Sequence, residues 1–282
     1  MAYRTWLQGP RHPLPRRVWP VQAETVHSYT MRLAQANHLP VKVLRLYLSG
    51  TPSSEHPRSD WLAVASGYPL DLLEIRLKGL TRGHGFAEQL RRSRPACRWC
   101  MARRGIDVPV YCWLPEHRTV CFRHRRWIGA PAHRWADQRG LDHHPAVLAA
   151  ARRHARIAHQ HTAFATVAMR DARRILNCWW REGAAITAVP NLRDLTVDEY
   201  LPSYGDHVAL AAVLANYRGR IATSSVPSDR LLDELCRQVT TVFAGRCGSS
   251  PALEQWISDQ RLMLRRPTGP LTRLLGLADH AG

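Results

Sequence analysis

The stretch LAQANHLPVKVLRLYL, residues 33–48, recurs without gaps as LAVASGYPLDLLEIRL, residues 62–77. The offset is 29 residues, and six of the sixteen positions are identical. Each copy has the pattern of a helix end, a short turn, and a second helix that opens at Pro40 or Pro69. Proline suits the first turn of a helix, because its missing N–H has no partner to lose there. The repeat therefore predicts two helical hairpins in the N-terminal part of the chain.

The second copy has the pattern of a helix-turn-helix motif in more detail. Ala63 is small where the two helices would cross closely, and Gly67 lies where the turn requires a positive φ. Leu73 is placed to pack back on the first helix. The first copy has Asn37-His38 at its turn, and asparagine also tolerates a left-handed conformation. The pattern favours DNA contact, although ordinary hairpins that pack on each other would share it.

Charge distinguishes the two copies as DNA readers. The second helix of the first copy carries Lys42 and Arg45, whereas the corresponding helix of the second copy carries Asp71 and Glu74. Carboxylates repel phosphates, so the first copy is the better candidate for DNA contact. We name Lys42 and Arg45 as its candidate contact residues.

Two short motifs have the spacing of metal-binding knuckles: CRWC at residues 97–100 and CFRH at residues 121–124. A tight turn places two ligands that are spaced by two residues on one side of a metal, and a second such turn completes a tetrahedron. The predicted ligands are Cys97, Cys100, Cys121 and His124. Three thiolates and one imidazole favour one Zn²⁺ ion and leave no open coordination position, so the predicted site is structural.

The segment between the knuckles reads as a hairpin. Residues 108–114 alternate as a strand, residues 115–117 can turn, and residues 118–120 can return. Such a hairpin would bring the two knuckles together, as in a zinc ribbon. Cys112 shares a strand face with Val110 and Leu114, which indicates a core thiol.

The remaining cysteines and the histidine-rich stretch are interpreted as structural or solvent-exposed. Cys178, Cys236 and Cys247 have no partner at metal-ligand spacing, and we expect them to pack in helices. We expect a basic helical stretch to present its histidines to solvent; these are His143, His144, His154, His159 and His161.

Net charge indicates a polyanionic partner. The chain has 40 basic and 22 acidic residues, a formal charge of +18. A field this positive attracts nucleic acid, although an acidic protein surface would also neutralise it. Between residues 82 and 135, twelve arginines face three acidic residues and are interleaved with tryptophan, which suits phosphate contact and stacking. The candidate contacts in this segment are Arg98, Arg118, Arg123, Arg125 and Arg126.

Motifs for common catalytic chemistry are missing from the sequence. There is no Walker loop, no Rossmann glycine pattern and no H-E-x-x-H. No apolar run has the length of about 18 residues that a membrane-spanning helix needs. The first twenty residues lack the apolar stretch of a signal peptide. We therefore expect a non-enzymatic protein of the cytoplasm that associates with the nucleoid.

Three stretches together resemble the TniQ family, the targeting adaptors of certain bacterial transposons. They are the opening WPVQAETVHSYTMRLAQAN of residues 19–37, the knuckle of residues 97–100, and the strand with Trp113 followed by the knuckle of residues 121–124. The likeness covers residues 19–128. It implies an adaptor that links DNA-targeting machinery to an AAA+ transposition regulator, which recruits the transposase. Such adaptors do not cut DNA.

The chain departs from the family pattern in three ways. Phe122 stands where the family usually has proline, and His38 where it often has glycine. Larger members carry further zinc-binding elements, and none is visible after residue 136. The resemblance therefore implies a short, standalone member.

Taken together, these patterns predict a mainly α protein in four segments. They are an extended Pro- and Arg-rich arm (residues 1–21), a helix-turn-helix-like domain (22–90), a zinc ribbon (91–135) and a C-terminal helical domain (136–282). Prolines should break the last segment at residues 190, 202, 227, 251 and 267. The predicted function is a zinc-stabilised adaptor in DNA transposition or target-site selection. The alternatives are a transcription regulator and a protein–protein scaffold with a basic docking face.

Overall fold

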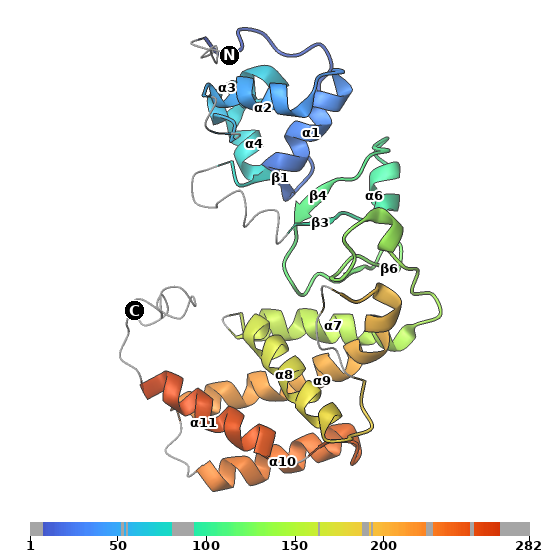
Figure 1. Cartoon of the computed structure of the whole chain (residues 1–282), viewed down its shortest axis with the longest axis vertical. Coiled ribbons are helices and arrows are strands. Elements are labelled where there is room, and N and C mark those ends of the chain that lie inside the picture. The colour runs from blue at the N-terminus through green and yellow to red at the C-terminus, as the bar shows by residue number, and fades with distance from the viewer. Residues whose placement is uncertain are drawn as a thin grey trace. The chain divides into compact units, whose positions relative to one another are not determined.

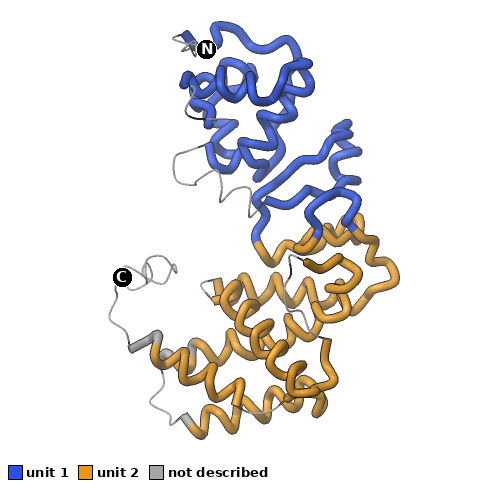
Figure 2. Tube along the Cα trace, viewed as in Figure 1, with its two compact units in different colours: residues 1–115, 132–138 blue, residues 116–131, 139–282 orange. Residues whose placement is uncertain are grey.

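The computed structural model of the chain is mainly helical (Figure 1). It describes residues 8–51, 54, 56–80, 93–162, 164–187, 192, 194–223, 228–248 and 251–265. The chain forms two compact units: residues 1–115 with 132–138, and residues 116–131 with 139–282 (Figure 2). These bounds differ from the predicted domains, since the segment of residues 91–135 does not form a unit of its own.

The first unit contains the two predicted hairpins. The first consists of α1 (Val26–Ala36) and α2 (Val41–Ser49), and the second of α3 (Ser59–Ser66) and α4 (Leu70–Arg76). The side chain of Thr25 caps α1 by accepting a hydrogen bond from the Ser28 N–H at 3.1 Å. Pro40 and Pro69 immediately precede α2 and α4, as the sequence predicts.

The turns of the two hairpins share a left-handed residue at the aligned position, although that residue differs between them. Gly67 ends α3 with φ +71°, which confirms the predicted left-handed position. The aligned residue of the first hairpin is His38, with φ +56°, whereas Asn37 has φ −101°. At this turn the left-handed conformation is therefore taken by His38 and not by Asn37. The Asn37 side chain instead bonds the backbone of Arg16 in the arm.

The repeated leucines form the core of the first unit. Each is at most 2% exposed: Leu33, Leu44, Leu48, Leu62, Leu73 and Leu77. Burying one leucine side chain contributes about 1.5–3 kcal/mol. The identities between the two copies are therefore explained by a shared packing requirement.

The first unit also contains a small sheet. Its strands are β1 (Glu24–Thr25), β2 (Leu77–Lys78), β3 (Ser93–Pro95) and β4 (Tyr111–Trp113), in the order β2-β1-β4-β3. The strand predicted within residues 108–114 is thus present, and Cys112 is buried in it, as predicted. The predicted hairpin with residues 118–120 is wrong, because both edges of β4 are already paired, with β1 and β3. β5 (Val120–Cys121) pairs with β6 (Arg126–Trp127) in a separate two-stranded sheet.

The second unit is a helical bundle built around one long helix, α9 (Val197–Thr223). This helix packs against α7 (Pro145–Gln160), α8 (Ala165–Arg181), α10 (Ser228–Phe243) and α11 (Pro251–Arg265). Pro251 begins α11, as predicted, but Pro202 lies inside α9. It is the sixth residue of the helix and removes one backbone hydrogen bond, and packing against several other helices maintains α9. The other three predicted breaks lie outside the described residues. Among the described helices, none combines the length and apolarity required to span a bilayer.

Candidate metal centre

The first knuckle is built from the end of β3 and a short helix. Cys97 precedes α6 (Arg98–Ala102), and its carbonyl accepts the Met101 N–H at 3.1 Å. The Ala96 N–H donates to the Val110 carbonyl at 2.8 Å. Because Val110 directly precedes β4, this bond fixes the start of the knuckle beside that strand. Cys97 is buried and Cys100 is half-buried. The thiols are thus partly protected from solvent, as metal ligands usually are.

Residues 135–138 hold the first knuckle in place. The side chain of Gln138 is buried, donates to the carbonyls of Pro95 (3.2 Å) and Ala96 (2.9 Å), and accepts the Arg98 N–H at 3.1 Å. The indole N–H of Trp135 also donates to the Ala96 carbonyl, at 2.8 Å. Sequence reasoning missed both residues. An isolated glutamine forty residues from its partner gives no signal in the sequence.

The loop that carries Gln138 is closed by Asp137. Its carboxylate accepts the N–H groups of His133 at 3.0 Å and Arg134 at 2.8 Å. Burial raises the pKa of Asp137. The two backbone donors and the nearby charge of Arg134 lower it by more, so the net pKa lies below its ordinary value. Asp137 therefore remains ionised at neutral pH and keeps the loop folded.

The second knuckle is a tight turn between β5 and β6. Cys121 pairs with Arg126 across the strands, and the His124 N–H bonds the Cys121 carbonyl at 3.2 Å. Arg125 takes φ +43°, so the chain turns sharply after the ligand histidine. The Nδ1 atom of His124 lies 3.8 Å from the sulfur of Cys121.

The base of the second knuckle packs on α9 within the second unit. Trp127 is fully buried and contacts the ring of Tyr204 edge-on, with ring centroids 4.8 Å apart. The hydroxyl of Tyr204 lies 2.9 Å from Oγ1 of Thr119 and 3.0 Å from Nδ1 of His154. His154 is therefore buried, and the expectation that it faces solvent is wrong.

The structure brings the four predicted ligands together. The sulfur atoms of Cys97, Cys100 and Cys121 and a ring nitrogen of His124 all lie within 4.8 Å of one another. In a tetrahedral site with Zn–S bonds of about 2.3 Å, adjacent sulfurs are about 3.8 Å apart, so the cluster is close to the size that a metal requires. None of the seven cysteines forms a disulfide. The cluster can hold one metal ion, and no other such group of three or more ligands occurs among the described residues.

The candidate nucleic-acid contacts differ in accessibility. Lys42 is exposed on α2, whereas Arg45 is half-buried and its guanidinium lies 3.0 Å from Nε2 of His27. The exposed members near the knuckles are Arg98, Arg118, Arg123 and Arg125. Arg125 lies 3.7 Å from the carboxylate of Asp142. Arg126 is buried, which makes it the least accessible residue of the set.

Comparisons of the chain with protein-family models, with curated proteins and with solved structures found no match.

Proposed function

We propose that the chain is a non-catalytic, zinc-stabilised adaptor that associates with DNA in transposition or target-site selection. The observation that carries the proposal is the cluster of Cys97, Cys100, Cys121 and His124. A Cys₃His set is typical of structural zinc, and it leaves no coordination position for a substrate. Bound zinc contributes on the order of 10 kcal/mol to folding in such sites, which is comparable to the net stability of a whole domain.

The distribution of charge supports a role in DNA binding. The first unit has 18 basic and 8 acidic residues, a net charge of +10, and the second has 22 and 14, a net charge of +8. Both units therefore attract phosphates. Arg123 and Arg125 are exposed on the second knuckle, next to the half-exposed ring of Phe122.

The helices of the first unit offer little for reading a base sequence. α2 exposes Lys42 and Val43, and the guanidinium of Arg45 is engaged with His27. α4 exposes Asp71 and Glu74, which repel phosphates. Because base readout needs several side chains aimed at base edges, we propose that specificity comes from a partner. The family resemblance suggests an AAA+ transposition regulator, with a transposase or a targeting complex beyond it.

The test of DNA association is a salt titration with duplex DNA. Affinity should fall steeply with salt, with a logarithmic slope of about −0.9 for each phosphate neutralised. The double variant Arg123→Glu/Arg125→Glu should flatten the slope and retain its metal. The matched control Arg156→Glu/Arg237→Glu reverses two exposed arginines on helices of the second unit. No binding by the wild-type chain at low salt would contradict DNA association and favour the protein–protein scaffold.

A transcription regulator is the second candidate, favoured by the turn between α3 and α4. Gly67 takes the left-handed conformation there, as the helix-turn-helix pattern predicts. A regulator that acts alone would select a sharp, palindromic consensus from random duplexes. The adaptor should instead give a flat selection profile. The same selection, repeated with an added AAA+ partner, tests whether the partner supplies specificity.

A further inference from the structure

A groove in the first unit has five arginines among its fourteen described lining residues. It has a volume of about 1000 Å³ and is formed by the arm, the end of α1, Arg76 of α4 and residues 104–108. Its lining includes Arg16, Arg17, Arg76 and Arg104, with Asp107 as the acidic residue among the described lining residues. None of these arginines was among the candidate contacts predicted from the sequence.

Three exposed arginines form the rim of this groove, and their charge is not neutralised within the described part of the chain. Arg16, Arg17 and Arg104 are exposed, and none of them forms an ion pair with a described residue. Arg32 also lines the groove, but it is buried and paired with Glu24. The rim guanidiniums therefore remain available to an anionic ligand.

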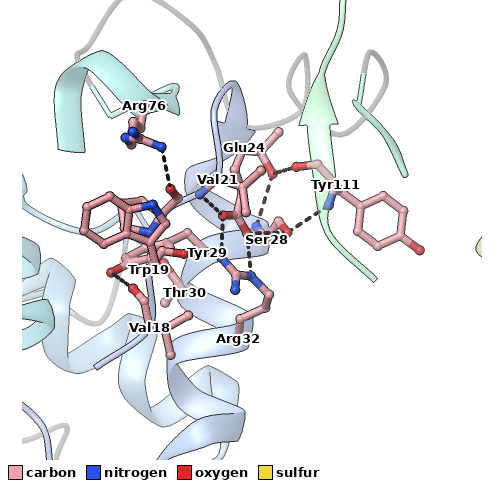
Figure 3. A network of polar contacts seen from close by, with 12 residues as sticks. Val18, Trp19, Val21, Glu24, Ser28, Tyr29, Thr30, Arg32, Arg76 and Tyr111 are labelled. Atoms are coloured by element: carbon pink, nitrogen blue, oxygen red, sulfur yellow. Dashed lines mark hydrogen bonds and ion pairs between the residues drawn. The ribbon is translucent and has the colours of Figure 1, made fainter. Parts of the chain in front are cut away.

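The arm that carries the rim arginines is fixed to α1. The Arg16 N–H donates to Oδ1 of Asn37 at 2.9 Å, and the Asn37 amide donates to the Arg16 carbonyl at 2.9 Å. Further along the arm, the Arg32 guanidinium donates to the Trp19 carbonyl at 3.0 Å and to the carboxylate of Glu24 (Figure 3). A binding surface whose backbone is already ordered loses less entropy when it binds.

Trp19 adds an aromatic ring to the lining of the groove. Its side chain is 49% exposed, although it has packing partners on the protein side. The guanidinium of Arg76 lies over its ring, 5.0 Å from the ring centroid (Figure 3). Tyr68 contacts the indole edge-on, with ring centroids 5.2 Å apart. These contacts hold the indole in one orientation. A fixed and exposed indole between arginines is suited to stack on a planar group of an anionic ligand.

These features fit a polymer better than a small metabolite. Small-molecule pockets bury most of the surface of their ligand. This groove presents exposed guanidiniums from two separate segments of the chain, with one aromatic ring among them. A basic groove with an aromatic side chain is the arrangement by which proteins bind unpaired nucleic-acid strands.

We infer that this groove binds single-stranded nucleic acid, with phosphates on Arg16, Arg17 and Arg104 and an unpaired base on Trp19. The inference rests on the proposed association with DNA, and it adds the strandedness of the ligand and the place where it binds. Melted or displaced strands are the sites at which such a ligand would occur.

The inference is tested by fluorescence anisotropy of the full chain with labelled oligo(dT) of about 15 nucleotides and with a duplex of equal length. The groove variant is Arg16→Glu/Arg17→Glu/Arg104→Glu. Its control, Arg156→Glu/Arg230→Glu/Arg237→Glu, makes the same change in net charge on exposed helical positions of the second unit. Metal content and thermal unfolding of each variant establish that it is folded.

The groove variant should bind oligo(dT) at least about tenfold more weakly than the control variant. Trp19→Ala should lose about fivefold or more, and Trp19→Phe should lose less because it keeps an aromatic face. Equal losses in the groove variant and in its control would overturn the inference, as would a groove variant that loses only duplex binding. Normal duplex binding that depends on Arg123 and Arg125, with oligo(dT) binding indifferent to the groove, would overturn the inference and leave the proposed function intact. Failure of the wild-type chain to bind either probe would contradict both.

Discussion

Among the described residues, each unit buries one arginine–carboxylate pair, and the two pairs differ in geometry. In the first unit, Arg32 donates two hydrogen bonds to the carboxylate of Glu24, at 2.8 and 2.6 Å, and the two side chains are 4% and 0% exposed. In the second unit, Arg218 approaches the carboxylate of Asp171 with a single contact of 3.4 Å, and both side chains are about a tenth exposed.

The carboxylate of the first pair also accepts more hydrogen bonds from other groups than the carboxylate of the second pair. Glu24 also accepts the Ser28 hydroxyl at 2.9 Å and the Val21 N–H at 3.0 Å (Figure 3), so its carboxylate is fully satisfied. Asp171 accepts one further bond, from the indole of Trp256 at 2.9 Å. Removing charge from water is costly unless the remaining hydrogen-bonding capacity is filled.

The comparison shows that buried charge has a different use in each unit. The pair of the first unit joins the arm to α1 and thereby orders the backbone that carries the groove. The pair of the second unit joins α8, α9 and α11, whose contacts are otherwise mainly apolar. We therefore expect the first pair to be the more sensitive to substitution.

The largest effect should follow from Arg32→Met, which leaves Glu24 buried without its partner. Loss of one member of a buried pair costs about 3–5 kcal/mol. Hydrogen exchange of peptides from α1 should report the loss, together with release of the arm. The double variant Glu24→Gln/Arg32→Met removes both charges and should recover part of the stability. A loss below about 1 kcal/mol in Arg32→Met would contradict the comparison.

A buried histidine makes the second unit sensitive to acid without any ion pair. Burial lowers the pKa of His207 to about 4, and its ring bonds the Ser203 carbonyl at 2.9 Å. The folded state therefore keeps His207 neutral, while an unfolded chain protonates it near pH 6.5. The contribution of neutral His207 to the unfolding free energy is fully present above pH 6.5. It should fall by about 3 kcal/mol as the pH drops from 6.5 to 4.

The variant His207→Leu isolates this effect. The difference in unfolding free energy between wild type and variant should depend on pH in this window, because acid-induced loss of metal is common to both proteins. Hydrogen exchange of peptides from α9 provides the measurement. A difference that is constant from pH 7 to pH 4 would show that His207 does not titrate as its burial requires.

The smallest effect should follow from Arg218→Met. The contact with Asp171 is long, and the indole of Trp256 remains as a donor to the carboxylate, so the cost should be about 1–3 kcal/mol. Burial lowers the pKa of Arg218, while the charge of Asp171 opposes that shift. Exchange of peptides from α8 and α11 would report the change. A cost equal to that of Arg32→Met would remove the distinction between the two pairs.

The parts of the fold that follow local rules could be predicted from the sequence. The leucine spacing of the repeat predicted both hairpins of the first unit, and Gly67 marked a left-handed turn. The knuckle spacing predicted all four members of the metal-ligand cluster, since each pair lies within a few residues. In each of these cases a local sequence pattern determines the local geometry.

Features that depend on distant partners could not be predicted. β4 pairs with β1 and β3 rather than with the segment that follows it, and nothing in residues 108–120 indicates that choice. Gln138 holds a knuckle forty residues away, and His154 is buried because Tyr204 lies beside it. Nothing in the sequence distinguishes Arg16, Arg17 and Arg104 from the other arginines. Only the fold brings residues 16–17 and residue 104 to the same groove.

The central claim is that the cluster of Cys97, Cys100, Cys121 and His124 holds structural zinc, and elemental analysis tests it directly. Protein that is freshly purified without any chelator should contain close to one zinc ion per chain. Cys97→Ser and His124→Ala should lower the zinc content sharply, whereas Cys178→Ser, a half-buried cysteine outside the cluster, should retain it. Wild-type protein without zinc, or with zinc that survives loss of Cys97 and His124, would contradict the account.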